Sequence, residues 1–336
     1  MDSRLKTAAM LSLFLLVPLY GTRFSCAALQ AERANSPELE EAGKLSRQAR
    51  SFFAENKFDE ALALAKQALE IREKILGRDH EEVAASLDTL ADIHVARQKY
   101  EVAEPLYRRS LAILEKKWGP ESKYLTSTIE SLALVRFALR DNGGAEKLYL
   151  RSLAIKEKVL GPDDPGTGKT LAIIGVFYER IEKPAKAAEF FKRSLAVKEK
   201  ELGPNHPNLV EPLYNCACSL IAANKPSEAK AYQLRAESIV AAPAPVSRGF
   251  VLQGNATLRV EPEYPPEARR QRVSGQVVVE VKVDECGRVI DARAVKGHAD
   301  LVDGAIKAAR QWRFTSTRLA GRPVKVIGTI TFNFHL

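Results

Sequence analysis

Residues 153–164, LAIKEKVLGPDD, decide the fold, because close copies of this stretch recur along the chain. LAILEKKWGPES starts 42 residues earlier, at residue 111, and LAVKEKELGPNH starts 42 residues later, at residue 195. The same spacing relates Gly77, Gly119, Gly161 and Gly203. A repeat of this length indicates supersecondary units that stack on one another, because a single unit cannot bury its apolar face alone.

Each repeat unit predicts two helices. Apolar residues recur every three or four positions in residues 82–97 and again in residues 102–117, which is the period of an amphipathic helix. The glycine that follows the second helix is expected to adopt the left-handed conformation, and the proline after Gly119 stops the helix. Small residues such as Ala91 and Ala103 predict that paired helices approach closely. We expect five helix pairs between about residue 41 and residue 240.

A small–aromatic–small pattern runs through these pairs as Ala91, Ala103, Tyr107 and Ser110. It recurs 42 residues later as Ala133, Ala145, Tyr149 and Ser152. This pattern resembles the tetratricopeptide repeat, in the long form found in kinesin light chains. The usual period of that repeat is about 34 residues, and the extra residues here lengthen the second helix and the connector.

The resemblance implies a right-handed superhelix whose first helices line a concave groove. A mixed acidic and apolar lining suits an extended peptide or a partner helix. The alternative is that these positions form only a solvated helix face. The groove positions of the family map onto Asp88, Asp92, Val95, Glu130, Leu134, Phe137, Val176, Glu179 and Tyr214.

The pattern changes after an Ala/Pro-rich spacer at residues 240–247. QVVVEVKV at residues 276–283, residues 289–296 and VKVIGTITFNF at residues 324–334 alternate apolar with polar side chains, which predicts three strands. Helical patterns cover two further segments, and the expected order is α-β-β-α-β. The predicted helices are residues 264–272 and 300–311.

This segment resembles the C-terminal domain of the TonB family over about residues 260–336. The motifs that carry the resemblance are tyrosine–proline before the first helix, glycine before the first strand, an Asp-x-x-Gly turn, and tryptophan with phenylalanine after the second helix. In this sequence they are Tyr264 with Pro265, Gly275, Asp284 with Gly287, and Trp312 with Phe314.

The TonB resemblance implies a periplasmic domain that grips a short N-terminal peptide of an outer-membrane transporter. The grip is addition of the peptide to the exposed edge of the last strand through main-chain hydrogen bonds. The alternative is an edge that a dimer mate or the spacer covers. The edge residues expected here are Val324, Lys325, Val326, Ile327, Gly328, Thr329, Ile330, Thr331 and Phe332.

The first 28 residues have the pattern of a secretory signal peptide. Arg4 and Lys6 give a positive start, residues 8–20 are mostly apolar, and small residues follow, so that cleavage is expected after Ala27. Two alternatives stay open: the segment remains uncleaved as a membrane anchor, or Cys26 carries a lipid.

Cys216 and Cys218 are expected neither to pair with each other nor to hold one metal ion. Cys216 and Cys218 fall two positions apart on a predicted helix and so point to different faces. We expect them to be small buried side chains, and we expect Cys286 to be exposed in a hairpin turn.

Composition and motifs argue against nucleic-acid binding and catalysis. The formal net charge of +9 is concentrated at the C-terminal end, where residues 247–336 hold 15 Lys and Arg against 9 Asp and Glu. A nearly neutral body with a basic end lacks one continuous basic face for nucleic acid. PGTGKT at residues 165–170 looks like a phosphate-binding loop, but Asp163 stands where the motif needs glycine. No histidine has metal-ligand spacing, and we expect no enzyme, no cofactor and no bound metal.

The sequence therefore predicts a signal peptide at 1–28, an all-α tetratricopeptide-type superhelix at 29–240, a linker at 241–249 and a TonB-like α-β-β-α-β domain at 250–336. The expected function is that of an exported periplasmic protein that binds proteins or peptides, an outer-membrane TonB-dependent transporter or another envelope protein among them. The alternatives are an inner-membrane-anchored TonB-type energy transducer for transmembrane transport, and a homodimeric envelope scaffold. We expect no nucleic-acid partner, and membrane contact only with an uncleaved N-terminus.

Overall fold

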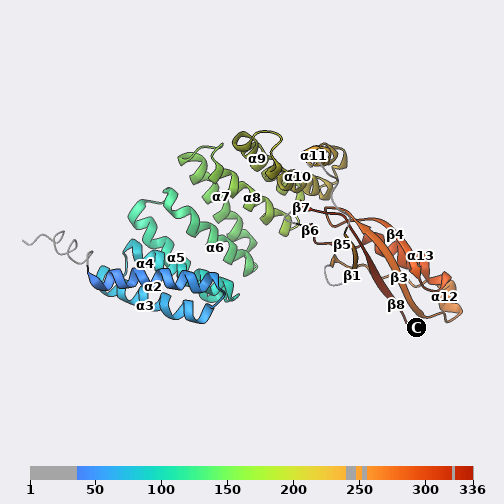
Figure 1. The fold of residues 1–336 in the computed structure, drawn as a ribbon, viewed down its shortest axis with the longest axis horizontal. Helices are drawn as coiled ribbons and strands as arrows, with labels where there is room; N and C mark the ends of the chain where they lie inside the picture. Colours follow the sequence, from blue (N-terminus) through green and yellow to red (C-terminus); the bar gives the residue numbers. More distant parts are fainter. Residues whose placement is uncertain (1–35, 240–246, 252–255, 320–321, 336) are drawn as a thin grey trace, which may run out of the picture. The chain divides into compact units, whose positions relative to one another are not determined.

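The computed structural model describes residues 36–239, 247–251, 256–319 and 322–335 (Figure 1). The predicted signal peptide lies outside the described residues. The chain forms two compact units, residues 1–148 and residues 149–336. Among the described residues, no helix is long and apolar enough to cross a membrane.

The predicted repeat architecture is confirmed. Helices follow one another as five pairs in the described part of the chain, with short 3₁₀ turns η1 (Lys123–Leu125) and η2 (Pro207–Leu209) before two of them. The pairs are α2 (Pro37–Ala54) and α3 (Phe58–Leu76), α4 (Glu81–Ala96) and α5 (Tyr100–Trp118), α6 (Thr126–Ala138) and α7 (Asn142–Val159), α8 (Pro165–Arg180) and α9 (Pro184–Leu202), and α10 (Val210–Ala222) and α11 (Pro226–Ile239).

Small residues let the helices of a pair approach each other. Ala91, Ala103 and Ser110 are completely buried, and Tyr107 is 2% exposed. The Ser110 hydroxyl donates a hydrogen bond to the Ala84 carbonyl across the pair, at 3.2 Å. A one-atom increase in side-chain size at such positions would separate the helices, because protein interiors are close-packed.

Gly175 takes the place that alanine holds in the other repeats, and the structure explains the exchange. A Cβ atom at Gly175 would lie 2.7 Å from the ring of Phe191, the aromatic residue that packs against α8. Glycine is needed at this position because the ring already fills the space of a methyl group.

Repeat-related ion pairs join successive second helices of the repeats. In the first unit, Glu73 pairs with Arg109 at 2.6 Å. In the second unit, equivalent pairs join Glu157 to Arg193 and Glu199 to Arg235. Each pair is partly exposed and therefore contributes at most about 1 kcal/mol. These ion pairs favour one register between neighbouring repeats and add little to the stability of the fold.

The glycine connectors differ from the expected left-handed cap. Gly119 follows α5 with φ 82° and ψ 161°, so its ψ is extended instead of helical. This region of backbone space is open almost only to glycine. The Gly119 N–H still donates to the Glu115 carbonyl at 2.9 Å and closes the last turn of the helix. The chain therefore leaves the helix in an extended direction.

The PGTGKT segment forms the first turns of α8. The Asp164 carboxylate caps this helix by accepting a hydrogen bond from the Gly166 N–H at 2.7 Å. Gly168 faces α9, where an added Cβ would lie 2.8 Å from the Val197 side chain. Helix capping and close helix packing thus account for the glycines of the segment.

The C-terminal domain contains the expected α-β-β-α-β elements and additional short strands. Its main sheet has the order β1-β8-β3-β4. β1 runs parallel to β8, whereas β3 is antiparallel to both β8 and β4. The elements are β1 (Ser247–Val251), β2 (Ala256–Leu258), α12 (Pro266–Arg270), β3 (Gly275–Val283), β4 (Val289–Lys296), α13 (Ala299–Gln311), β5 (Arg313–Phe314), β6 (Arg318–Leu319), β7 (Arg322–Pro323) and β8 (Val326–Phe334).

One face of this sheet and α13 enclose the core of the domain. Val277 and Val279 of β3 and Leu301 and Ala305 of α13 are completely buried there. The indole N–H of Trp312 donates to the Val260 carbonyl at 2.8 Å, which ties the end of α13 to the segment before α12. The buried side chains of β3 and the Trp312 hydrogen bond together hold α13 in place against the sheet.

We predict that Gly119→Ala destabilises the first unit, because alanine strains the backbone at this φ and ψ although no atom lies within 4 Å of the added Cβ. The free energy of unfolding in urea should fall by about 1–3 kcal/mol. Gly43→Ala is the matched control: Gly43 lies inside α2, where alanine should stabilise by about 0.5–1 kcal/mol. Equal effects of the two substitutions would contradict this account of the connectors.

Candidate partner-binding surfaces

The predicted edge strand is paired on both sides over part of its length. β8 pairs with β3 from Val326 to Phe334. On its other side, β1 pairs with Val326, Ile327, Gly328 and Thr329. The expectation of a free edge was therefore wrong for these four residues, and the covering residues come directly after the spacer. A five-residue segment with Gly249 inside it gives no readable strand pattern, which is why the sequence did not reveal β1.

Val324 and Lys325, expected at the edge, lie before β8 and are used within the domain. Val324 is 1% exposed, and its N–H donates to the Thr317 carbonyl at 2.9 Å. The Lys325 ammonium lies 3.6 Å from the Glu285 carboxylate. The Val324 main-chain N–H is therefore not free for a partner, and Lys325 lies outside the strand with its side chain paired within the domain.

Side chains alternate along β8 between the core and the opposite face of the sheet. Ile330 and Phe332 are buried in the core, whereas Thr329 and Thr331 are half-buried on the other face. The ring of Phe332 packs edge-on against Trp312, with ring centroids 5.5 Å apart. The core-facing half of the strand is thus committed to packing. A partner would meet its main chain and its outer row of side chains.

The β3–β4 turn is built around one buried carboxylate. Asp284, 5% exposed, accepts hydrogen bonds from the N–H groups of Cys286 and Arg288, at 3.0 and 2.9 Å. It also accepts two bonds from the Arg288 guanidinium, at 2.9 and 2.7 Å. Gly287 has φ 81°, and an added Cβ would lie 1.8 Å from the Phe314 carbonyl oxygen. The Asp-x-x-Gly motif therefore fixes the shape of this turn.

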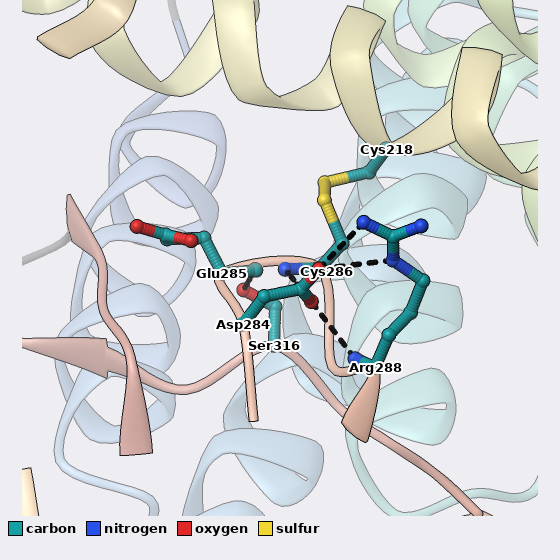
Figure 2. The surroundings of a disulfide bond; sticks show 6 residues. All are labelled: Cys218, Asp284, Glu285, Cys286, Arg288 and Ser316. Carbon is teal, nitrogen blue, oxygen red and sulfur yellow. Dashed lines mark hydrogen bonds and ion pairs between the residues drawn. A yellow bond between two sulfur atoms is a disulfide. The ribbon is translucent and has the colours of Figure 1, made fainter. Parts of the chain in front are cut away.

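A disulfide joins Cys286 in this turn to Cys218 on α10 (Figure 2). The Cα atoms are 5.3 Å apart, within the usual range for a disulfide. Cys216 and Cys218 do not pair with each other, as expected, but Cys286 is half-buried and bonded instead of exposed in its turn. The sequence analysis compared only cysteines close in sequence, and the two partners are 68 residues apart. Cys216 is the free and buried cysteine of the described residues, as expected.

Tyr214 does not line an open groove. It lies one helical turn before Cys218 on α10 and is 5% exposed. Burial raises the pKa of the Tyr214 hydroxyl, and the negative charges of Glu285 and Glu237 act in the same direction. Because its side chain is buried, Tyr214 is not available to line a groove, which the repeat pattern cannot foresee.

In the first unit, the structure brings two predicted groove helices together. Asp88 of α4 accepts a hydrogen bond from the Thr128 hydroxyl of α6 at 2.7 Å. Burial raises the pKa of Asp88 to about 6; the Ser110 and Thr128 hydroxyls oppose the shift, and Asp92 adds to it. Burial also raises the pKa of Asp92, which accepts a hydrogen bond from the Tyr107 hydroxyl.

The remaining predicted groove residues differ in exposure. Leu134 of α6 is 46% exposed, while Val95, Glu130 and Phe137 are half-buried. In the second unit, Val176 and Glu179 are exposed on α8. The first unit thus carries an exposed leucine on α6 and carboxylates of raised pKa on α4. This combination suits a segment with apolar side chains and hydrogen-bond donors or positive charge.

No group of three or more His, Cys, Asp or Glu side chains in the described part of the chain could hold a metal ion. Three of the histidines cap helices instead. The Nδ1 atoms of His80, His206 and His298 accept hydrogen bonds from main-chain N–H groups at the helix starts, at 3.2, 3.1 and 3.4 Å.

We predict that Cys286→Ser lowers the free energy of unfolding by about 2–4 kcal/mol, because the disulfide closes a long loop in the unfolded chain. A reductant should lower the stability of the natural chain to the same level and leave the variant unchanged. Mass mapping of unreduced peptides should show Cys218 linked to Cys286. A natural chain that does not respond to reductant would contradict the linkage.

We predict that Asp88→Asn stabilises the first unit at neutral pH. The folded-state pKa of Asp88 lies above its unfolded value, so stability is lost as the pH rises from about 4 to about 6, and the full penalty is present above pH 6. The variant should exceed the natural chain in free energy of unfolding by up to about 3 kcal/mol at pH 7.5. The gain should disappear as the pH falls from 6 to below 4. Glu41→Gln, on the exposed surface of α2, is the control and should show no such pH dependence.

Both parts of the chain match known families. Residues 260–336 match the family "Gram-negative bacterial TonB protein C-terminal". Protein TonB from two strains of Xanthomonas campestris pv. campestris is 35% identical over 77 residues, which is 22% of this chain and 34% of the relatives. The chain thus spans about a third of the length of the curated relatives that it matches.

The repeats match the family "Tetratricopeptide repeat" at residues 40–116, 125–200 and 174–242. A solved Podosopora anserina structure of the kinesin light chain type, with nearly identical TPR-like repeats, has a TM-score of 0.54 at 22% identity, over 60% of this chain and 95% of that chain. BtubC (BKLC) from P. vanneervenii has a TM-score of 0.53 at 20% identity, over 67% of this chain and 97% of its own. These structures share the fold. Because the repeat matches cover more than half of the residues, the chain belongs to the tetratricopeptide repeat family and carries a C-terminal domain that matches the TonB family.

Proposed function

We propose that this chain is an exported envelope protein that binds other proteins through two surfaces. The C-terminal domain accepts an extended segment of an outer-membrane transporter, or of another envelope protein, at the edge of β8. The repeats hold a second partner. The domain limits proposed are a signal peptide at 1–28, repeats at 29–240, a linker at 241–249 and the TonB-type domain from residue 250, with the last three linker residues forming the start of β1 in the sheet of that domain.

The observation that carries this proposal is the pairing of β1 with β8. β1 is not one of the α-β-β-α-β elements, yet its main chain adds to the edge of β8 in parallel. The edge is therefore suited to strand addition, in which main-chain hydrogen bonds supply affinity and alternate side chains supply specificity. We assign the partner strand to residues from Val326 through Phe332, without Val324 and Lys325.

The disulfide supports export. Disulfides persist in oxidising compartments such as the bacterial periplasm and are rare in the cytosol. Cys218 and Cys286 lie in different structural elements, so their linkage is a lasting cross-link between α10 and the β3–β4 turn. Together with the signal-peptide pattern of the first 28 residues, this favours a periplasmic location.

The groove of the first unit supports a partner with hydrogen-bond donors or positive charge. On α4, Asp88 is half-buried and Asp92 is exposed, and burial of the carboxyl groups raises the pKa of both. α6 contributes the exposed Leu134. A cationic group would favour the ionised carboxylates and offset the penalty of their burial. The repeats then bind a different class of segment from the β8 edge.

The match to TonB proteins favours one second candidate, a membrane-anchored energy transducer for transport. That candidate needs the N-terminal segment to stay attached as an anchor. In a homodimeric scaffold, the third candidate, the C-terminal domain would bind the C-terminal domain of a second copy of the chain. The following experiment separates all three.

We predict a light-induced adduct between β8 and an envelope protein. A photo-crosslinking amino acid replaces Asn333, which is exposed on β8, in the full-length chain made in its own cell envelope. The matched control replaces Ile290, 49% exposed on β4 at the opposite edge of the sheet. An adduct from position 333 that contains an envelope protein supports the proposal, and an adduct with a second copy of the chain supports the scaffold.

Equal adducts from both positions, or none from position 333, would overturn the assignment of the β8 edge. N-terminal sequencing of the same purified protein tests export. A mature chain that starts at Ala28 supports a periplasmic protein, whereas a start at Met1 or Asp2 supports the anchored transducer.

A further inference from the structure

β1 occupies the main-chain groups that strand addition at β8 would use. Its register pairs Ser247 with Val326, Arg248 with Ile327, Phe250 with Gly328 and Val251 with Thr329. The main-chain N–H and C=O groups of β8 that face β1 are used in hydrogen bonds to β1 and are not available to another strand. A partner strand and β1 therefore cannot pair with residues 326–329 at the same time.

The two neighbours of β8 hold it with different strength. β3 pairs with all nine residues of β8 in unbroken antiparallel register. β1 is five residues long, and its register shifts between Arg248 and Phe250, so that Gly249 has no partner in the register. Glycine inside a strand, a bulge and parallel pairing each weaken the ladder. β1 is thus the neighbour that can be exchanged without dissolving the sheet.

From this geometry, and resting on the proposed function, we propose that β1 is a built-in competitor that occupies the partner-strand site on β8 and is displaced when a partner binds. The partner segment then runs parallel to β8, as β1 does. Because β1 belongs to the same chain, it competes at the high effective concentration of a tethered ligand. Binding is selective for segments that pair better than β1.

The exposed and buried rows of β8 define the chemistry of the partner segment. On the core side, the neighbours are the buried Val326, Gly328 and Ile330. On the outer side, they are the half-buried Ile327 and Thr329. A partner strand therefore has apolar residues at the alternate positions that face the core beside Val326, Gly328 and Ile330. The outer row accepts polar or charged residues, because the register of β1 pairs Arg248 with Ile327 there.

The competitor lowers the apparent affinity of any partner by the fraction of molecules in which β1 has left the edge. If that open state is populated at about 1–10%, removal of β1 raises the apparent affinity about 10- to 100-fold. The intrinsic affinity of the edge does not change. The experiment measures the change in apparent affinity.

The test uses the full chain and a labelled synthetic peptide, VSRGFVL, which has the sequence of residues 246–252. In the opened variant, Arg248→Pro with Phe250→Pro removes main-chain donors from β1. In the locked variant, Val251→Cys with Thr329→Cys places a disulfide across one register pair, whose Cα spacing in a sheet lies within disulfide range. The single variants Val251→Cys and Thr329→Cys are the controls for the lock.

The opened variant should bind the peptide about 10- to 100-fold more tightly than the natural chain, and the locked variant should not bind it. Amide exchange at residues 326–329 should speed up in the opened variant and slow down again when the peptide is added. Amides of β3 should stay protected throughout, which shows that the domain is folded. Equal peptide affinity of the natural, opened and locked chains would overturn the proposal.

Photo-crosslinking from position 333 in the locked and opened backgrounds separates this inference from the proposed function. A locked chain that still captures the envelope partner as the natural chain does would overturn the inference and leave the proposed function standing. An opened chain that binds the peptide but captures no envelope protein supports the competitor and removes the proposed partner. Reduced capture by the locked chain alone supports both.

Discussion

The unbroken pairing of β8 with β3 is the contact on which the C-terminal domain depends. Nine residue pairs join the two strands, and their core-facing side chains meet the apolar side of α13. Because β3 pairs with one side of β8 along its whole length, another strand can pair with β8 only on the other side. β1 is there in the isolated chain, so the binding surface is better described as an occupied edge than as a bare one.

The family motifs of the domain are explained by its own architecture. The Tyr264 hydroxyl donates to the Val273 carbonyl, and its ring packs edge-on against Phe334. Asp284 closes the β3–β4 turn, and Gly287 leaves room for the backbone at Phe314. These residues hold the domain together and do not lie on the β8 edge. Partner choice therefore depends on the outer row of β8 and on the strength of β1.

The disulfide gives the last repeat a role beyond stacking. α10 is the first helix of its pair, a position expected to line a groove, but its Cys218 is bonded to Cys286 of the C-terminal domain and its Tyr214 is buried. We therefore propose the groove surface in the first unit, where α4 carries Asp88 and Asp92 and α6 carries the exposed Leu134. The two partner-binding surfaces that we propose differ in chemistry: one offers main-chain groups and the other carboxylates.

The sequence by itself determined the helical repeats, their small–aromatic packing and the α-β-β-α-β domain. Those features depend on local periodicity and on motifs whose members act over short distances, as Gly119 and the Asp284 turn do. Tertiary structure alone decided that β1 covers β8 and that Cys218 bonds to Cys286. Each of these depends on a contact between distant segments, 68 residues apart for the disulfide, and no local pattern encodes which distant segment will supply the hydrogen bonds or the sulfur atom.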